Sequence, residues 1–251
     1  MKIKLIHNGK PYQADLQVPI DISIPLDAGN ETVNCFYAPP LEVSPVVAGD
    51  FIGSTEQGGP VNFMNIKLNP HGNGTHTECV GHIARERFTI NQCLKTFHFP
   101  ARLVTVTPET LENGDRIILR RSLEQVFHHD DVEALIIRTL PNEISKMKRH
   151  YSGTNPVYFH HDAISFLVER GINHLLTDLP SVDREEDGGK LLAHKAFWKY
   201  PEDIRRSATI TELVYVPDVV TDGLYLLNVQ ITSLEVDASP SKPVIYQLTK
   251  L

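Results

Sequence analysis

The order strand, helix, strand between residues 134 and 177 constrains the fold more than any other feature of the sequence. Residues 134–138 (Ala-Leu-Ile-Ile-Arg) form a nearly continuous apolar run, which is typical of a strand covered on both faces. Residues 162–170 carry apolar side chains at helical spacing, with Asp162 as the expected N-cap and Gly171 as the expected stop. Residues 174–177 are expected to form another short strand. This order predicts a β-α-β unit with a parallel pair of strands.

Strands are expected along much of the remaining chain. Residues 2–7 and 12–18 flank Asn8-Gly9, which is a strong signal for a two-residue hairpin. Because strands outnumber helices, we expect one mixed α/β domain with a large sheet, spanning residues 1–251. Further strands are predicted at residues 20–26, 102–107, 116–119, 209–216, 224–234 and 244–248, with Pro240 and Pro243 separating the last two, and short helices at residues 122–128 and 190–198.

The segment between Leu26 and Leu68 gives two different signals. Up to Pro60 it is loop-like, and a long loop inside a compact domain is often a lid or a binding loop. A plain surface excursion is an equally good interpretation. Residues 61–68 then place Met64, Ile66 and Leu68 on one face, which predicts a half-buried strand.

Charge and cysteine content limit the classes of partner and compartment. The net charge of −7, without a basic stripe, argues against a nucleic-acid-binding protein. No apolar run reaches membrane-spanning length, and the N-terminus lacks the apolar core of a signal peptide. Cys35, Cys79 and Cys93 form no CxxC pair and suit a reducing compartment. We therefore expect a cytoplasmic protein that binds neither nucleic acid nor a membrane.

The chemistry of the chain is concentrated in residues 69–83 (Asn-Pro-His-Gly-Asn-Gly-Thr-His-Thr-Glu-Cys-Val-Gly-His-Ile). The imidazoles of His71, His76 and His82 and the carboxylate of Glu78 together suit zinc, manganese or iron. We interpret this stretch as half of a metal site. Thr75 and Glu78 also match a capping box, in which the glutamate would begin a helix and the histidines would be incidental.

Two later residues are candidates for the other half of the site. Glu212 lies among apolar neighbours, and a buried carboxylate needs a partner, which here is either a metal ion or a basic side chain. His194 falls on the expected helix 190–198, and by itself it suits a surface or helix-end position better than a ligand. Asp178, Ser181 and Asp183 are candidates for acceptors that orient an imidazole, or for simple turn residues.

At this point the residues resemble the cyclase family of metal-dependent hydrolases, which includes bacterial kynurenine formamidases. That family carries a His-x-Gly-Thr-His-x-Asp-x-Pro-x-His signature, and residues 74–82 here read Gly-Thr-His-Thr-Glu-Cys-Val-Gly-His. The likeness covers most of the chain, because residues 21–26, 135–139, 171–183 and 223–227 resemble family segments too. It implies a β-rich core with flanking helices, of the swivelling β/β/α type, and a homodimer or homotetramer.

The resemblance also implies one or two divalent ions, zinc or manganese, and assigns roles to individual residues. His76 takes the place of a metal-binding histidine, and Glu78 that of an aspartate that bridges two ions. His82 takes the place of the histidine that donates and accepts protons. His194 and Glu212 match the later histidine and bridging glutamate of the family.

Three departures from the signature affect the expected coordination. Gly72 stands where the family has its first histidine, and His71 lies one residue earlier. Glu78 replaces an aspartate and is one methylene longer, and Val80 replaces a proline. We expect a bulge or tight turn, with positive φ at the glycines, to bring His71 back to the metal. The competing view is that His71 points away and leaves a coordination position for water.

These residue types permit metal-assisted hydrolysis of an amide or cyclic amide in a small molecule. Metal-bound water would act as the nucleophile, and His82 would take its proton and return it to the leaving nitrogen. One alternative makes Cys79 the nucleophile, activated by His76 or His82. Two others are an Fe(II)-dependent oxygenase, since two histidines and one carboxylate can hold iron, and a metal-dependent binding protein without turnover.

Overall fold

The computed structural model describes residues 1–128 and 132–251, and its centre is a mixed eight-stranded sheet. The strand at one end, β16, also pairs with β17 near the other end, so the sheet closes into a barrel with only β3 outside. β9, β12, β14 and β15 run parallel, whereas β8 and β17 join antiparallel. In sheet order the strands are β16 (Gly223–Ile231), β9 (His98–Val106), β12 (Ala134–Thr139), β14 (His174–Thr177), β15 (Thr209–Glu212), β8 (His76–Glu78), β17 (Ala238–Gln247) and β3 (Ile20–Asp21). The expected β-rich mixed α/β fold with flanking helices is confirmed.

The predicted β-α-β unit is present as β12, α4 (His161–Glu169) and β14, with the two strands parallel. β12 is buried on both faces, as its sequence indicated: Leu135 and Ile137 belong to the core under the helices, and Ala134 and Ile136 to the core inside the barrel. The predicted cap of α4 is wrong by two residues, because His160 accepts the backbone N–H of Asp162 through its own ring.

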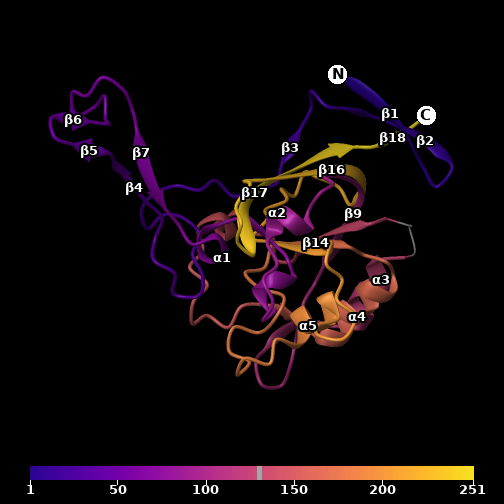
Figure 1. Cartoon of the computed structure of the whole chain (residues 1–251). Helices are drawn as coiled ribbons and strands as arrows, with labels where there is room; N and C mark the ends of the chain where they lie inside the picture. Colours follow the sequence, from indigo (N-terminus) through magenta and orange to yellow (C-terminus); the bar gives the residue numbers. More distant parts are fainter. Residues whose placement is uncertain (129–131) are drawn as a thin grey trace.

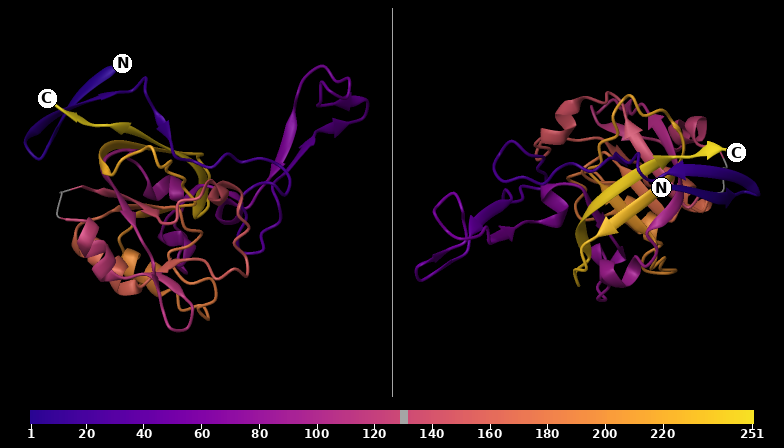
Figure 2. Two further views of the ribbon diagram at one scale, coloured as in Figure 1. Left: turned by 180° about the vertical axis from the view of Figure 1, so that it is seen from behind. Right: turned by 90° about the horizontal axis from the view of Figure 1, so that it is seen from above.

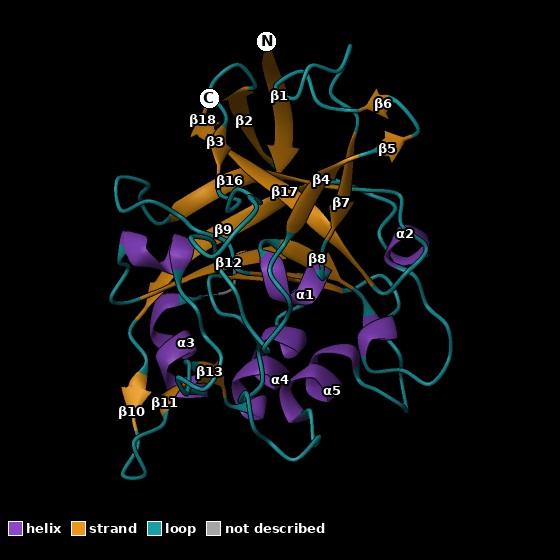
Figure 3. Ribbon diagram, turned by 90° about the vertical axis from the view of Figure 1, so that its left-hand side faces the viewer, coloured by secondary structure: helices purple, strands orange, loops and turns teal. Residues whose placement is uncertain are grey.

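Three helices lie together on one side of the barrel (Figures 1 and 3). They are α3 (Arg120–Val126), α4 and α5 (Leu192–Trp198), and each lies within two residues of its predicted position. Their apolar faces cover the parallel part of the sheet, with Phe166, Phe197 and Trp198 fully buried between the layers. None of the helices among residues 1–128 and 132–251 is long and apolar enough to cross a membrane.

The chain termini meet in a small separate sheet of β1 (Lys2–His7), β2 (Lys10–Asp15) and β18 (Thr249–Lys250) (Figure 1). The predicted hairpin is confirmed, since Asn8 and Gly9 both have positive φ, as a two-residue type I′ turn requires. The remaining short elements are β10 (Glu109–Thr110), β11 (Arg116–Ile118), β13 (Tyr158–Phe159), α1 (Pro70–Asn73), α2 (Ile90–Cys93) and the 3₁₀ turns Val80–His82 and Ile144–Lys148.

A long hairpin arm projects from the barrel and differs from the sequence expectation (Figure 2). It consists of β4 (Glu42–Pro45), β5 (Val47–Ala48), β6 (Phe51–Ile52) and β7 (Met64–Lys67), so the segment expected to be loop-like contains three strands. The prediction that Met64 and Ile66 line a half-buried strand is wrong, because β7 pairs only with β4 and every residue of β7 is exposed.

Two strand boundaries were also mispredicted. Pro240 and Pro243 lie inside β17 instead of before a strand. On one edge of β17 they fall where the neighbour changes from β8 to β3, and on the other edge Pro243 lies opposite Val229 of β16. β15 ends at Glu212 instead of residue 216, because Leu213 has a positive φ of 56° that no strand residue adopts.

Candidate metal centre

The barrel closure assembles a cluster of imidazoles and carboxylates from five parts of the chain. β8 lies between β15 and β17, and this register sets Glu212 opposite His76 and places residue 238 opposite Glu78. His71 comes from α1, His82 from the turn after β8, and His194 from α5. All six site residues expected from the sequence therefore meet in one place, together with Asp237.

Glu78 is the centre of this cluster. Its Oε1 lies 3.2 Å from His194 Nε2, and its Oε2 lies 3.2 Å from His71 Nδ1 and 3.7 Å from His82 Nδ1. His76 Nε2 approaches the second buried carboxylate, Glu212, at 3.4 Å. The ligand atoms of His71, His76 and Glu78 lie within 4.8 Å of one another, as do those of Glu78, His82 and His194, which is the spacing that a bound cation requires.

Several atoms of the cluster are buried without a hydrogen-bond partner. They are His76 Nε2, His194 Nε2 and both carboxylate oxygens of Glu78. A buried polar atom left without a partner costs about 1–3 kcal/mol, so such atoms are uncommon unless an ion or water satisfies them. Two imidazole nitrogens and a carboxylate facing one another are the ligand types that zinc and manganese accept, so these residues fit a divalent ion.

The imidazoles are held in place by acceptors on their other nitrogen. His194 Nδ1 donates to Asp183 Oδ2 at 2.6 Å, and His76 Nδ1 donates to the Gly74 carbonyl at 3.0 Å. Both rings therefore present Nε2 to the carboxylates. Such outer contacts fix the tautomer of a metal-binding histidine.

Of the three orienting candidates, only Asp183 contacts an imidazole. Asp178 instead forms a buried ion pair with Lys146 at 2.7 Å and accepts hydrogen bonds from Thr139. Ser181 accepts the backbone N–H of Asp183 and so shapes the turn that carries this carboxylate.

The charges of the cluster shift its pKa values strongly. Burial lowers the pKa of His194, but the hydrogen bond to Asp183 and the nearby carboxylate of Glu78 outweigh it and raise the pKa to about 10. Burial likewise opposes ionisation of Glu78, yet the electrostatic attraction of His82 and the close imidazoles of His194 and His71 hold its pKa well below the usual range. Glu78 is therefore an anion at neutral pH, ready to bind a cation.

His71 reaches the cluster by a different route from the expected bulge. Residues 70–73 form one helical turn, in which Asn69 accepts the N–H of Gly72 as N-cap. Gly72 lacks the predicted positive φ, and Gly74 is extended, with φ 162° and ψ −164°, instead of left-handed. Gly72 is required for close packing instead, because a Cβ there would lie 2.2 Å from the Ala38 Cβ. The helical turn points the His71 ring at Glu78.

Two sequence interpretations of neighbouring residues can be judged against the geometry. The capping box is wrong, because Glu78 belongs to a strand and Thr75 Oγ1 accepts from Ile24 N and donates to the Leu213 carbonyl. The Cys79 thiol is buried in the core inside the barrel and donates to the Phe88 carbonyl at 3.8 Å.

Asp237 is the residue of the cluster that sequence reasoning missed. Its Oδ2 lies 2.9 Å from His71 Nε2 and 3.4 Å from His82 Nδ1, and hydrogen bonds from these two histidines lower its pKa. It is far from the histidine stretch in sequence, and only the pairing of β17 with β8 brings it close. The signal available in the sequence was that Asp237 is an acidic residue directly before a strand, β17, and this strand pairs with the one that carries the histidine signature.

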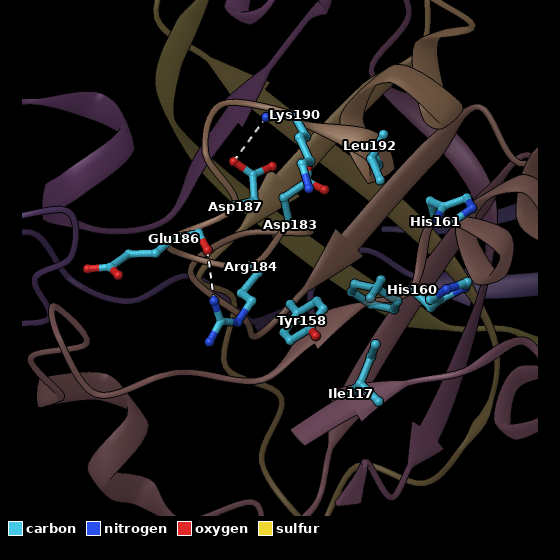
Figure 4. A pocket seen from close by; sticks show the side chains of 11 residues that line it. Ile117, Tyr158, His160, His161, Asp183, Arg184, Glu186, Asp187, Lys190 and Leu192 are labelled. Carbon is cyan, nitrogen blue, oxygen red and sulfur yellow. Dashed lines mark hydrogen bonds between the residues drawn. The ribbon is translucent and has the colours of Figure 1, made fainter. Parts of the chain in front are cut away.

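A cavity of about 400 Å³ adjoins the cluster behind Asp183 (Figure 4). Tyr158, His160, Arg184 and Lys190 are among the side chains lining it, and Asp183 lies on its wall. The carboxylate that holds His194 is thus also part of the lining of this cavity.

Comparison with known proteins finds one matching family and several relatives that share the name kynurenine formamidase. Residues 20–184 match the family model described as putative cyclase. The chain is 30% identical over 198 residues to kynurenine formamidase of Bacillus thuringiensis (strain Al Hakam), an alignment that covers 76% of this chain and 83% of the relative. Kynurenine formamidase of Bacillus mycoides (strain KBAB4) is 29% identical with the same coverage.

Solved structures share the fold at lower sequence identity. A potential metal-dependent hydrolase with cyclase activity superposes with a TM-score of 0.64 at 16% identity, over 91% of this chain and 97% of that one. Isatin hydrolase A from Labrenzia aggregata gives a TM-score of 0.64 at 15% identity, over 91% and 93%. The family match spans more than half of the sequence and includes the histidine signature, and the chain belongs to the putative cyclase family.

Proposed function

We propose that this protein is a metal-dependent hydrolase that cleaves an amide or cyclic amide bond in a small molecule. The observation that carries the proposal is the set of buried, unpartnered ligand atoms on His76, Glu78 and His194, with His82 beside them. The relatives named kynurenine formamidase and isatin hydrolase are amidases acting on non-peptide carbon–nitrogen bonds, which supports the same reaction class here.

The proposed ligands are His71, His76, Glu78, His194 and Glu212, holding one or two zinc or manganese ions. Glu78 suits a shared position, because its two oxygens face different histidines. Glu212 Oε1 accepts the Val182 N–H at 3.0 Å, which leaves Oε2 to face His76. A divalent ion at this place supplies a water of lowered pKa and polarises the carbonyl of the substrate.

His82 is the proposed proton donor and acceptor. Its side chain is 30% exposed, so it can meet a substrate, while Glu78 and Asp237 hold its Nδ1 side. A histidine in this position accepts the proton of the attacking water and delivers it to the leaving nitrogen, which would otherwise depart as a poor leaving group. The presence of two buried carboxylates, Glu78 and Glu212, among the proposed ligands disfavours the alternative of a two-histidine, one-carboxylate iron oxygenase.

Two measurements test the proposal. Elemental analysis after reconstitution should find at least about half an equivalent of zinc or manganese per chain, since structural and catalytic sites of this ligand type bind tightly. A screen of N-formyl anilines, cyclic amides and lactones should then reveal metal-dependent turnover that a chelator abolishes. Less metal than this, or oxygen consumption with Fe(II) instead of hydrolysis, would contradict the proposal.

We further propose that residues 1–251 act as one domain and assemble as a homodimer or homotetramer in the cytoplasm. The hairpin arm supports assembly, because an isolated two-stranded hairpin is marginally stable in water and this one exposes Val47, Phe63 and Ile66. Light scattering of the purified protein tests this, with a Phe63→Ser, Ile66→Ser variant expected to shift the mass towards the monomer. A monomeric wild-type protein would contradict it.

A further inference from the structure

The imidazoles that face the buried carboxylates share one arrangement, and Asp237 completes it. His76 and His194 each donate one ring N–H to a fixed acceptor, Gly74 O and Asp183, and turn the other nitrogen towards a glutamate. His71 does the same with its ring reversed. Its Nε2 meets Asp237 Oδ2 at 2.9 Å, and its Nδ1 faces Glu78 at 3.2 Å.

The position of Asp237 is fixed by the backbone around it. The carbonyl of Asp237 accepts the N–H of Cys79 at 3.0 Å, directly after the metal-site strand. Gly81 packs against its side chain, since a Cβ at residue 81 would lie 3.3 Å from the Asp237 Cβ and 2.1 Å from the Phe88 carbonyl. The turn that carries His82 can therefore approach Asp237 closely.

The same carboxylate oxygen also reaches His82. Asp237 Oδ2 lies 3.4 Å from His82 Nδ1, and the rings of His71 and His82 lie with their centroids 4.3 Å apart. One oxygen thus contacts both a proposed metal ligand and the proposed proton carrier. With Nδ1–H donated to Asp237, His82 presents Nε2 for proton transfer, which is the logic by which a carboxylate orients a catalytic imidazole.

We propose that Asp237 is a positioning residue: it fixes the tautomer of His71 so that Nδ1 binds the metal ion, and it orients His82 for proton transfer. This inference rests on the proposed function. The distance of 2.9 Å to His71 Nε2 is that of a hydrogen bond, and Glu78 faces the other ring nitrogen, Nδ1, at 3.2 Å, so the two carboxylates take opposite sides of the imidazole. Asp237 therefore acts through the two histidines.

This role explains how a displaced histidine can serve as a ligand. His71 enters the cluster from a helical turn and not from the strand, and it points Nδ1 inward where His76 and His194 point Nε2. A reversed ring needs its acceptor on the opposite side, and Asp237 supplies it. Because the acceptor is charged, it also strengthens the ligand by increasing the electron density of the imidazole.

The test is a double-mutant cycle on metal affinity, measured by titration with Zn²⁺ and with Mn²⁺ against a competing chelator. Asp237→Ala should weaken binding by about 10–100-fold, the usual effect of losing an outer partner of a ligand. Asp237→Asn should weaken it less, because an amide oxygen still accepts from His71 Nε2. In a His71→Ala background, Asp237→Ala should cause no further loss, since the two residues act as one unit.

Two further readouts separate positioning from a general structural effect. Asp237→Ala should lower kcat more than it changes KM, because the lost orientation of His82 affects proton transfer and not the binding of the substrate. Glu235→Gln is the matched control, since it removes a charge from the same segment but contacts Asn91 and Thr89 and no imidazole. It should leave metal affinity and kcat at wild-type values.

The results discriminate clearly. Wild-type metal affinity in Asp237→Ala, or an equal loss of affinity with and without His71, would overturn the positioning role while leaving the proposed function intact. A wild-type protein that binds neither ion would overturn the proposed function and this role with it.

Discussion

Asp183 allows the sharpest test of how the fold supports the site, because one side chain holds both a helix end and an imidazole. Its Oδ1 accepts the N–H of Ala193 at 2.7 Å, and its Oδ2 accepts the N–H of His194 at 3.1 Å and His194 Nδ1–H at 2.6 Å. α5 has no capping side chain of its own at its N-terminus, so Asp183 performs this function from another segment.

Asp183→Ala removes these three hydrogen bonds and leaves two buried backbone N–H groups without acceptors. Each such group costs about 1–3 kcal/mol, so we expect a loss of about 2–6 kcal/mol in the free energy of unfolding. For a chain of this size that corresponds to a fall in Tm of about 4–24 °C, at about 2–4 °C per kcal/mol. Metal affinity should fall by about 10–100-fold, because the His194 ring is no longer fixed.

Asp183→Asn separates the two roles. The amide offers one oxygen and one NH₂ group, and the NH₂ must face an N–H donor on one side. If the NH₂ group faces Ala193, one backbone hydrogen bond is lost. If it faces His194, the hydrogen bonds from both the backbone N–H and the ring Nδ1–H are lost, so the first orientation is favoured. We expect about 1–3 kcal/mol of lost stability with less than a tenfold loss of metal affinity.

The assay is urea unfolding in the presence of a chelator, so that stability is measured without metal, together with metal titration at neutral pH. Unfolding of Asp183→Ala within about 1 kcal/mol of wild type would refute the capping argument, given the cost expected for unsatisfied N–H groups. Wild-type metal affinity in the same variant would show that His194 is not a ligand.

The other predictions concern single side chains. His82→Ala should keep its metal content and lose about two to four orders of magnitude in turnover, and loss of the metal would make His82 a ligand. Cys79→Ser should retain activity, because water is the proposed nucleophile; an inactive variant with normal folding and metal would revive the thiol mechanism. Burial lowers the pKa of His174 to about 4, with the Arg205 charge adding to the effect. Between about pH 6.5 and 4, His174 is therefore protonated in the unfolded chain but neutral in the folded chain. The free energy of unfolding falls by up to about 3 kcal/mol as the pH drops through this window. His174→Gln should lose this part of the pH dependence of unfolding, and an unchanged dependence would contradict the assignment.

Local patterns predicted the elements that are defined by local physics. The apolar run at β12, the helical spacing of α4 and the Asn8-Gly9 turn each carry their signal in a few neighbouring residues, and all three elements are present. The prediction for the arm was wrong because burial of a strand face is not a local property. Alternation at Met64 and Ile66 indicates a strand, but whether one face is buried depends on what packs against it, and here β7 pairs with β4 and all its residues stay exposed.

The site residues likewise divide into those with a local signal and those without one. His76, Glu78 and His82 lie close together in one stretch of sequence, so the sequence indicated them directly. Asp237 could not be found in this way, because its closeness depends on the register between β17 and β8. The route of His71 was mispredicted because a four-residue helical turn, capped by Asn69, competes with the glycine bulge that the sequence also permits.

The location of the cluster at the closure of the barrel follows from the cost of burying charge. Glu78 and Glu212 lie on strands that are buried along their whole length, where an unpaired carboxylate is strongly unfavourable. His76 lies opposite Glu212 in the sheet, and Glu78 is approached by His71, His82 and His194 from outside the sheet. Asp183 holds His194, and Asp237 contacts His71 and His82. The fold therefore keeps buried anions with partners that only partly satisfy them, as the unpartnered atoms of His76 and Glu78 show. Such an arrangement costs stability in the metal-free protein, and a divalent cation is the group that relieves it, because it satisfies the carboxylate oxygens and imidazole nitrogens at once.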